Sequence, residues 1–295
     1  MDAWILFATA AAVGWAFVVL LDKFVIDSEI DDPMGTGGLH AFFNCLAVTV
    51  IAYALGGFNL SLSTAFAGLL IGGLYVVANY FWFSGVGSEE VSRFAPVLSF
   101  DIVFISILSF IFLGEVLTPL AYGGVALTVL GCILISLEDP MHSLRKMKSS
   151  WGLIAALASA FAYSIREVIF KHVSTGIEVW PLLFYFGLTG MIFSIPLIYR
   201  AEDAIIENTE GIEHMVLSGL ISGVAQATFF LAVSIGSVVL VSTITKTRFL
   251  LIFFGATAIS RLHPEIIHEK LDRRILIQKL VATLMIVVGV VLASL

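Results

Sequence analysis

Long apolar runs dominate the chain, and each has about the length that crosses a lipid bilayer. A transmembrane helix needs roughly 20 predominantly apolar residues. Because a backbone in lipid must satisfy its own hydrogen bonds, and no run alternates as a barrel strand does, we expect helices throughout. The first run lacks a basic leader and is too long for a signal peptide, so we expect it to be a span. Cutting the chain at Gly, Pro and charge clusters gives ten segments: 3–21, 38–56, 65–84, 91–113, 119–137, 151–172, 180–199, 214–233, 236–259 and 275–294.

The composition supports a membrane protein. Charged residues make up 13% of the chain, hydrophobic residues 59%, and the mean hydropathy is +1.04, whereas soluble domains carry about a quarter charged residues. The net charge is −7, with the acids concentrated in short connections such as IDSEIDD and AEDAIIENTEGIE, which we expect to be solvated. We therefore predict a multi-pass protein of the cell membrane, in contact with lipids and without a nucleic-acid partner.

The chain repeats itself at an offset close to 150 residues. The last match has the larger offset of 158, which locates an insertion between the ninth and tenth segments. The matches are Lys23 with Lys171, Gly68 and Gly72 with Gly219 and Gly223, and GCILISL (131–137) with GVVLASL (289–295).

Each repeat holds five helices, and an odd number makes the second copy enter the bilayer in the opposite orientation. We therefore predict an all-α integral membrane protein with ten transmembrane helices in two inverted five-helix repeats, at 1–137 and 151–295, joined by a linker at 138–150. Many secondary transporters have this architecture, with substrate sites near the bilayer midplane between the halves. We expect the GxxxG pairs to serve close helix packing.

The segment SRFAPVLSFDIVFISILSFIFLGEVLTPLAYGGVALTVLGCILIS resembles the EamA family of the drug/metabolite transporter superfamily. The resemblance rests on Pro96, on Leu113-Gly114-Glu115 and on Gly131. It implies alternating-access transport of small metabolites or drugs, commonly export, through a cavity between the halves. In the second half the signature has changed, since Lys246 stands at the place equivalent to Pro96, and Pro264-Glu265 stands where the first half has Gly114-Glu115.

Five ionisable residues lie within predicted spans, away from their ends: Asp101, Arg166, Glu167, Lys246 and Arg248. Each costs about 2.5 to 3.5 kcal/mol at the centre of a membrane helix, so five exposed to lipid would cost on the order of 15 kcal/mol. They must face protein, water or one another. Such residues are candidates for a functional site, and buried structural ion pairs are the alternative.

Spacing separates the roles of the two cations in the ninth segment. Lys246 and Arg248 project about 200° apart on a continuous helix, so we expect one to face the substrate and the other to form an ion pair. We favour Lys246 for the substrate and expect Arg248 to pair with Asp101 or Glu167. Asp101 has no cation within a helical turn, so its partner must lie on another helix. It is our first candidate for a proton carrier or cation ligand.

Glu167 has two interpretations. It is a second candidate for proton coupling, and it also lies four residues before Lys171, where an intrahelical ion pair is expected. Arg166 points about 100° away from Glu167 and lies late in its span, where its side chain can reach the interface.

Uncharged polar residues complete the predicted site. Tyr75 and Gln226 are equivalent in the two repeats, each one turn beyond its GxxxG motif, so a shared cavity wall is expected. The alternative for each residue is an interhelical hydrogen bond without a ligand. With Lys246, the candidate substrate-binding residues are Tyr75, Asn79, Tyr163 and Gln226; Asn44 and Tyr80 are further polar residues within spans.

The charge distribution predicts an orientation. Eleven of the fifteen Lys and Arg residues lie in odd-numbered loops, and Lys171 is alone in the even loops and termini. The positive-inside rule then places the odd loops in the cytoplasm and both termini outside. The family resemblance implies the opposite.

These observations predict a secondary active transporter of a small polar metabolite, anionic or zwitterionic, such as an amino acid or an organic anion, with proton or ion coupling. The basis for the anion is the excess of three intramembrane cations over two carboxylates. The alternative is a channel or lipid-headgroup scramblase with a charged aqueous path.

We expect no enzyme, cofactor or metal site, because no HExxH, clustered Cys or His ligands, phosphate-binding loop or nucleophile elbow is present. The six histidines lie near span ends or in loops, where solvation is expected.

Overall fold

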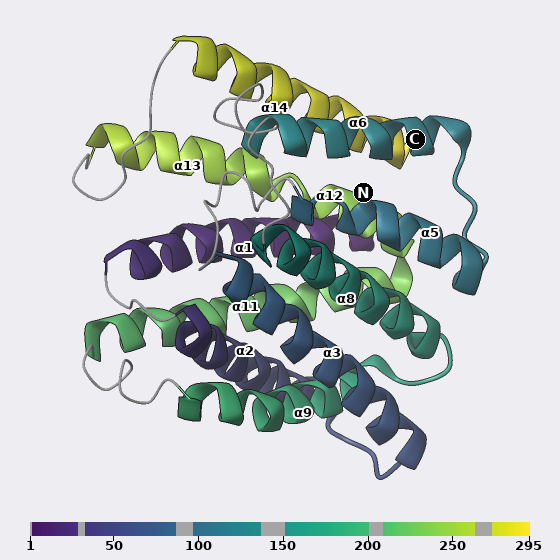
Figure 1. The fold of residues 1–295 in the computed structure, drawn as a ribbon. Helices are drawn as coiled ribbons and strands as arrows, with labels where there is room; N and C mark the ends of the chain where they lie inside the picture. The colour runs from purple at the N-terminus through teal and green to yellow at the C-terminus, as the bar shows by residue number, and fades with distance from the viewer. Residues whose placement is uncertain (1, 29–32, 87–96, 137–150, 201–208, 263–272) are drawn as a thin grey trace.

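The structure, a computed structural model, describes residues 2–28, 33–86, 97–136, 151–200, 209–262 and 273–295, and every regular element in these ranges is an α-helix (Figure 1). The first half of the chain contributes α1 (Ala3–Ser28), α2 (Pro33–Gly56), α3 (Leu62–Val86), α5 (Asp101–Leu113) and α6 (Pro119–Ser136). The second half contributes α8 (Trp151–Ser174), α9 (Val179–Arg200), α11 (Thr209–Ile235), α12 (Val238–Thr245), α13 (Arg248–Leu262) and α14 (Arg273–Ser294).

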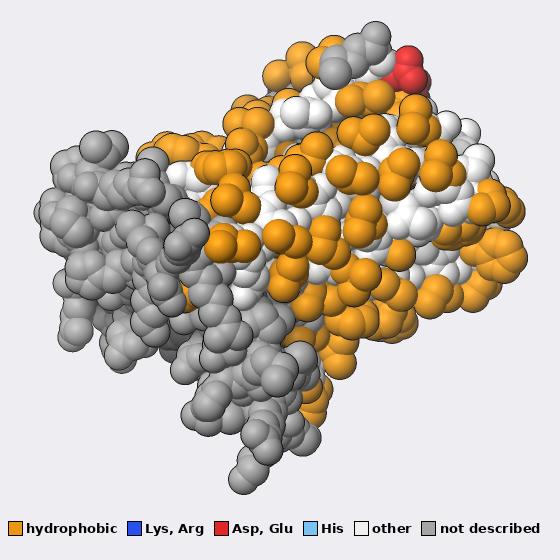
Figure 2. Space-filling view, turned by 90° about the horizontal axis from the view of Figure 1, so that it is seen from above, with side chains coloured by type: hydrophobic (Ala, Val, Ile, Leu, Met, Phe, Trp, Pro, Cys, Tyr) orange, Lys and Arg blue, Asp and Glu red, His pale blue; other side chains and the backbone are white. Residues whose placement is uncertain are grey.

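The helices have the length and composition of membrane spans. Among the described residues, eight spans are long and apolar enough to cross a bilayer, with α12 and the start of α13 forming one of them, and two shorter apolar helices cover Asp101–Leu113 and Pro119–Leu134. On the face seen in Figure 2, the described residues present apolar and neutral groups, with acidic atoms at one edge. The prediction of an all-helical membrane protein is therefore confirmed. The count of ten crossing helices stays a prediction.

Two of the predicted spans are interrupted near their middle. Within the described part of the fourth, residues 97–98 are helical, a turn follows at 99–100, and α5 begins at Asp101. The ninth was predicted as one helix over 236–259, and that prediction is wrong in one respect: the chain divides into α12 and α13 at Lys246 and Thr247.

The second interruption has a local cause in the sequence STITKT. The amide of Lys246 donates to the carbonyl of Thr243 at 3.1 Å and that of Thr247 to Ile244 at 3.0 Å, so bonds three residues apart replace the α-helical pattern. The hydroxyls of Thr245 and Thr247 donate to the carbonyls of Ser242 and Ile244, each at 2.8 Å. Such side-chain bonds compete with the helical ladder and favour a break.

Contacts between helices occur in matching sets across the two halves. By order in the chain, α1 corresponds to α8, α2 to α9 and α3 to α11. When each helix is exchanged with its counterpart, the contact of α1 with α11 becomes that of α8 with α3, and the contact of α2 with α11 becomes that of α9 with α3. The contact of α5 with α8 likewise corresponds to that of α1 with α12 and α13. Three contacts map onto themselves: α2 with α9, α5 with α12, and α6 with α14, the pair at the top of Figure 1. The halves are therefore interleaved, and their interface runs through the centre of the protein.

The GxxxG glycines lie at two of these matching contacts. A Cβ on Gly72 of α3 would come within 2.7 Å of the Phe186 carbonyl oxygen on α9. A Cβ on Gly223 of α11 would come within 2.5 Å of the Asn44 carbonyl oxygen on α2. Glycine allows the helix backbones to approach at both places, as the packing interpretation predicts.

Adjacent glycines on α6 provide a test of this packing. A Cβ on Gly124 would lie 2.5 Å from both the Gly289 carbonyl oxygen and the Ala293 amide nitrogen on α14, whereas one on Gly123 would meet nothing within 4 Å. We expect Gly124→Ala to destabilise the protein by about 1–3 kcal/mol through overpacking. Gly123→Ala, the matched control, should stabilise it by up to ~1 kcal/mol through helix propensity. Thermal unfolding in detergent measures both, and equal shifts would contradict the contact of α6 with α14.

Candidate functional site

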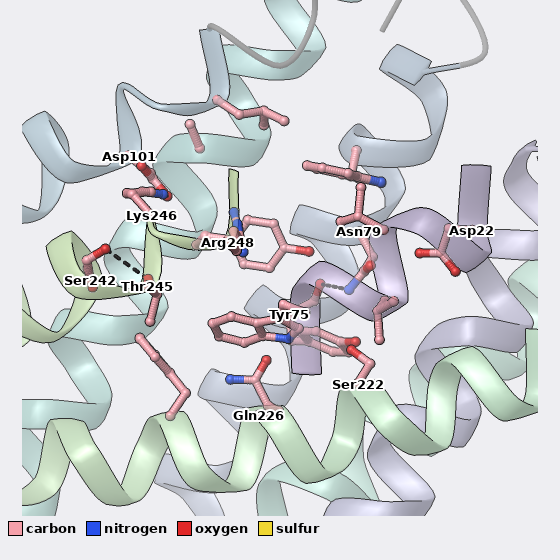
Figure 3. A pocket seen from close by; sticks show the side chains of 18 of the residues that line it. Asp22, Tyr75, Asn79, Asp101, Ser222, Gln226, Ser242, Thr245, Lys246 and Arg248 are labelled. Carbon is pink, nitrogen blue, oxygen red and sulfur yellow. Dashed lines mark hydrogen bonds and ion pairs between the residues drawn. The ribbon is translucent and has the colours of Figure 1, made fainter. Parts of the chain in front are cut away.

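A cavity of ≈180 Å³ lies between the two halves of the chain (Figure 3). Its walls come from α1, α2, α3 and the start of α5 in the first half, and from α8, α11, α12 and α13 in the second. The structure brings all nine predicted site residues to this cavity: Tyr75, Asn79, Asp101, Tyr163, Arg166, Glu167, Gln226, Lys246 and Arg248.

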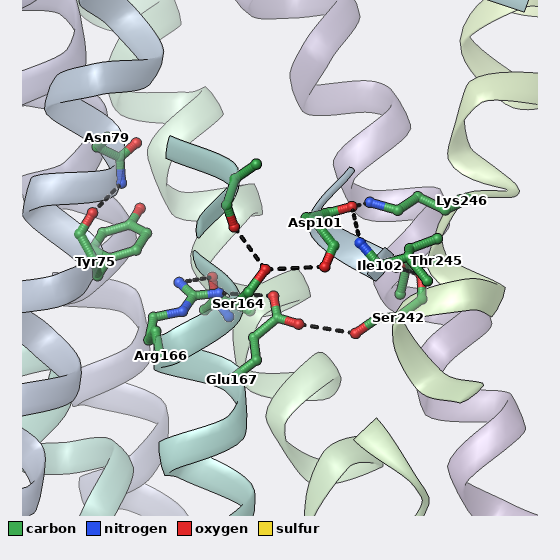
Figure 4. A network of polar contacts seen from close by, with 12 residues as sticks. Tyr75, Asn79, Asp101, Ile102, Ser164, Arg166, Glu167, Ser242, Thr245 and Lys246 are labelled. Atoms are coloured by element: carbon green, nitrogen blue, oxygen red, sulfur yellow. Dashed lines mark hydrogen bonds and ion pairs between the residues drawn. The ribbon is translucent and has the colours of Figure 1, made fainter. Parts of the chain in front are cut away.

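The interrupted helices meet in an ion pair at the cavity wall. Lys246 Nζ lies 2.5 Å from Asp101 Oδ2, and the two side chains are 3% and 17% exposed (Figure 4). Asp101 is the first residue of α5 and also accepts a bond from the Ile102 amide at 2.7 Å. Lys246 is the C-cap of α12. Each charge therefore lies at the helix end whose dipole favours it, the carboxylate at an N-terminus and the ammonium at a C-terminus. The prediction that Asp101 has its partner on another helix is confirmed.

A second ion pair lies on α8. Arg166 Nη2 contacts Glu167 Oε1 at 3.4 Å, and the side chains are 2% and 9% exposed. Ser242 of α12 donates to Glu167 Oε2 at 2.9 Å, and Arg166 Nη1 donates to Gln226 Oε1 of α11 at 3.3 Å. The pair therefore connects three helices.

Aromatic rings surround the Arg166 guanidinium. Its carbon lies 4.8 Å from the ring centroid of Tyr163, 5.2 Å from that of Phe230 and 5.4 Å from that of Tyr75. The negative faces of such rings attract a cation. The expectation that Arg166 reaches the interface is wrong, because these rings and the bonds to Glu167 and Gln226 hold it inside.

Arg248 is the cavity cation without a carboxylate. Its guanidinium carbon lies 5.4 Å from the ring centroids of Trp15 and Phe249, and no described carboxylate lies within ion-pair distance. The predicted pairing of Arg248 with Asp101 or Glu167 is not found. The break at Lys246 also explains why both cations reach one cavity, since the angle of 200° assumed a continuous helix. Figure 3 shows Arg248 between the pair of Asp101 and Lys246 and the more distant Asp22.

Lys171 and Glu115 hold the turn between α11 and α12. Lys171 Nζ donates to the carbonyls of Val233, Ser234 and Gly236 at 3.0, 3.3 and 2.8 Å. Cations favour this end of a helix, where carbonyls lack helical partners. The predicted intrahelical pair of Glu167 with Lys171 is therefore absent, because each side chain bonds to another helix.

Glu115, from the Leu-Gly-Glu signature, approaches the same turn from the connection between α5 and α6. Ser237 donates to its Oε2 at 2.8 Å, and the amide of Val238 donates to its Oε1 at 3.4 Å. A carboxylate at the N-terminus of α12 satisfies amides that lack helical partners. Together, Glu115 and Lys171 link both halves at the end of the molecule that carries the connections 57–61, 114–118 and 175–178.

Sequence reasoning missed a cluster at the opposite side of the cavity. Asp22 of α1 and His40 of α2 both line it, and His40 is 6% exposed. His40 Nδ1 lies 3.6 Å from Asp22 Oδ1 and 3.3 Å from Ser218 Oγ of α11, and the Ser218 hydroxyl donates to Asp22 Oδ1. The expectation that His40 is solvated is wrong. Helix α1 continues past Asp22 to Ser28 and α2 begins at Pro33, so both residues lie within helices. The sequence contained one signal for this longer helix, because no Gly or Pro lies between Asp22 and Pro33.

Hydrogen-bonding capacity remains in the wall. Gln226 Nε2 and Arg166 Nε, both in the wall, are buried donors without a partner among the described residues. Asn44, outside the lining residues, has such an acceptor in Oδ1. Asn44 donates through Nδ2 to Ser222 Oγ at 2.8 Å, and Asn79 donates to the Tyr75 carbonyl at 3.1 Å. Unpaired buried polar atoms require an explanation, and a ligand or water is one.

The structure thus combines apolar helices of membrane-spanning length with a cavity lined by charged and polar side chains. Residues 2–137 match the model of the EamA-like transporter family, which belongs to the drug/metabolite transporter superfamily, so the predicted resemblance is confirmed for this part of the chain. A crystal structure of another protein has the same fold, with a TM-score of 0.74 and 16% identity, and the match covers 99% of this chain and 96% of that chain. The second half therefore shares this known fold as well.

The pair of Asp101 and Lys246 predicts strong coupling between two substitutions. Removing one partner of a buried ion pair costs about 3–5 kcal/mol, because the other charge is left alone. We expect Asp101→Asn and Lys246→Met each to destabilise the protein on this scale. The double variant should be more stable than the sum by about 1–3 kcal/mol.

Thermal or denaturant unfolding in one detergent measures this cycle. Glu178→Gln, which changes an exposed carboxylate, is the control and should remain within about 0.5 kcal/mol of the parent protein. Additive effects of Asp101→Asn and Lys246→Met would show that the two charges do not depend on each other.

Proposed function

We propose that the protein is a secondary active transporter of the cell membrane that moves a small organic anion, or a zwitterion with a carboxylate, through this cavity by alternating access. The observation that carries the proposal is Arg248, a cation on the cavity wall without a carboxylate partner among the described residues. The EamA family supports the transport of a small molecule across a membrane.

The distribution of charge identifies the anchor. Lys246 is neutralised by Asp101 at 2.5 Å, and Arg166 by Glu167 at 3.4 Å. Arg248 is then the cation with free donors, and we assign to it the role that the sequence suggested for Lys246. A guanidinium binds a carboxylate through two parallel hydrogen bonds, which fixes the orientation of the ligand as well as its charge.

The size and walls of the cavity support a small substrate. A volume of ≈180 Å³ is close to the roughly 150 Å³ of an engineered cavity that binds benzene. This suits a molecule of about amino-acid size. Trp15, Trp82, Phe229 and Phe249 add apolar wall area beside Arg248, which suits the carbon skeleton of the substrate.

The matching helix contacts support an inverted repeat. Two five-helix units, 1–137 and 151–295, connected through 138–150 and inserted with opposite orientations, account for contacts that exchange with one another. Each unit contributes one interrupted helix, and transporters place their sites at such interruptions near the bilayer midplane. The bonds of Glu115 and Lys171 connect the two halves at one end of the molecule, and we propose that they break when this end opens.

Transport by the purified protein in liposomes tests the anchor. Radiolabelled alanine, glutamate, phenylalanine and lactate are the probes. With the probe that is transported, we expect Arg248→Gln to raise the KM about 10- to 100-fold, as expected for the loss of about 1.5–3 kcal/mol of charged hydrogen bonding. The KM of Arg248→Lys should lie between those of the parent protein and Arg248→Gln, because lysine keeps the charge and loses the planar fork.

Lys279→Gln is the matched control, because it removes a cation over the ring of Phe253, outside the residues that line the cavity. Its KM should equal that of the parent protein. An unchanged KM for Arg248→Gln would remove the anchor. Flux that does not saturate would favour the channel or scramblase.

A further inference from the structure

The cluster of Asp22, His40 and Ser218 has a chemistry that anion binding does not use. Imidazole is the side chain that gains or loses a proton near neutral pH. Here it is buried at the cavity, 3.6 Å from a carboxylate oxygen and 3.3 Å from a hydroxyl that itself donates to that oxygen. The three residues come from α1, α2 and α11, so the cluster connects the two halves.

The hydrogen bonds determine which nitrogen accepts a proton. The Ser218 hydroxyl gives its hydrogen to Asp22, so its oxygen is available to accept one from His40 Nδ1. In neutral His40 the hydrogen therefore lies on Nδ1, and Nε2 carries the free lone pair. Nε2 is therefore the atom to which a proton could add, and the Asp22 carboxylate lies 3.6 Å from the other ring nitrogen.

Among the described residues, the helices packed around His40 contribute few other charged or titratable groups. Helix α1 contributes Asp22, and α11 contributes Ser218, with His214 one turn before it. Helix α3 contributes the Phe83 ring, 6.1 Å from the imidazole, and α9 contributes apolar residues beside Gly38. Arg248 lines the same cavity from α13.

The charge of the cavity connects this proton to the substrate. Asp22 adds a third carboxylate to the three cations of the cavity, so the predicted excess of cations is not found among the described lining residues. At formal charges the sum is zero with neutral His40 and +1 with protonated His40. An anion alone would bring the cavity to −1, and an anion with a proton returns it to zero. Because uncompensated charge within the membrane is costly, the neutral combination is the one that favours crossing.

We propose that His40, oriented by Ser218 and paired with Asp22, is the proton-binding site that couples the movement of one proton to that of one substrate anion. This inference rests on the proposed function, because it requires that the cavity carry an anion. It assigns coupling to His40 rather than to Asp101 or Glu167, whose charges hold Lys246 and Arg166.

Proton uptake during substrate binding gives the direct test. The protein in weakly buffered detergent solution, with a pH-sensitive dye, receives the transported probe from the set of alanine, glutamate, phenylalanine and lactate. We expect uptake of about one proton per protein between pH 6 and 8, and at least tenfold less for His40→Gln. His172→Gln changes an exposed histidine in the last turn of α8, and its proton uptake should equal that of the parent protein.

Liposome transport provides the second measurement. We expect His40→Gln and Asp22→Asn to reduce accumulation driven by a pH gradient at least tenfold more than they reduce exchange of internal for external substrate. Gel filtration and ligand binding show that each variant is folded.

Full proton uptake or full gradient-driven accumulation by His40→Gln would overturn the proposal. If the parent protein transports its probe without proton uptake, coupling through His40 fails while the proposed transport function stands. If it transports none of the probes, the proposed function fails first.

Discussion

The ion pair between Asp101 and Lys246 is the interaction on which the centre of this protein depends. Two helices are interrupted inside an apolar fold, and each interruption leaves backbone groups and a helix dipole without a helical continuation. The carboxylate lies at the start of α5 and the ammonium at the end of α12, so each charge compensates one of these ends. The attraction between them then holds the first half of the chain against the second.

The remaining charges follow from this arrangement. Because Lys246 is engaged by Asp101, and Arg166 by Glu167, Arg248 lies beside Trp15 without a carboxylate partner among the described residues. This guanidinium and the aromatic walls around it are the basis of the proposed anionic substrate. His40 and Asp22 lie together at the other side of the cavity, where we place the proposed proton.

Sequence reasoning predicted the membrane helices, the approximate limits of most spans and the set of residues around the cavity. The cost of charge in lipid is a strong constraint, and it leads from five ionisable residues to one shared polar space. The pairing of those residues was not predictable, because it depends on the break after Thr245. That break results from hydroxyl bonds to the carbonyls of Ser242 and Ile244, a detail that hydrophobic periodicity does not report. His40 was missed for a related reason, since a histidine at the edge of an apolar run resembles a loop residue until the adjacent helices are placed.

The role of the Leu-Gly-Glu signature also became clear only from the packing. Glu115 bonds to the start of α12 while Lys171 bonds to the end of α11, so one turn is held from two directions. This turn lies at the end of the helix that carries Lys246. Helix α12 therefore joins this turn directly to the ion pair of Lys246 with Asp101.

The central proposal is alternating access, in which the end held by Glu115 and Lys171 opens during transport. The most direct measurement is the distance between spin labels at Val116→Cys and Ile235→Cys, which are 72% and 58% exposed, in a protein whose buried Cys45 and Cys132 are replaced by Ala. Pulsed electron paramagnetic resonance in lipid should show one short distance without substrate and a second, longer population when the transported substrate is present. A single unchanged distance under conditions in which the labelled protein transports would contradict the account.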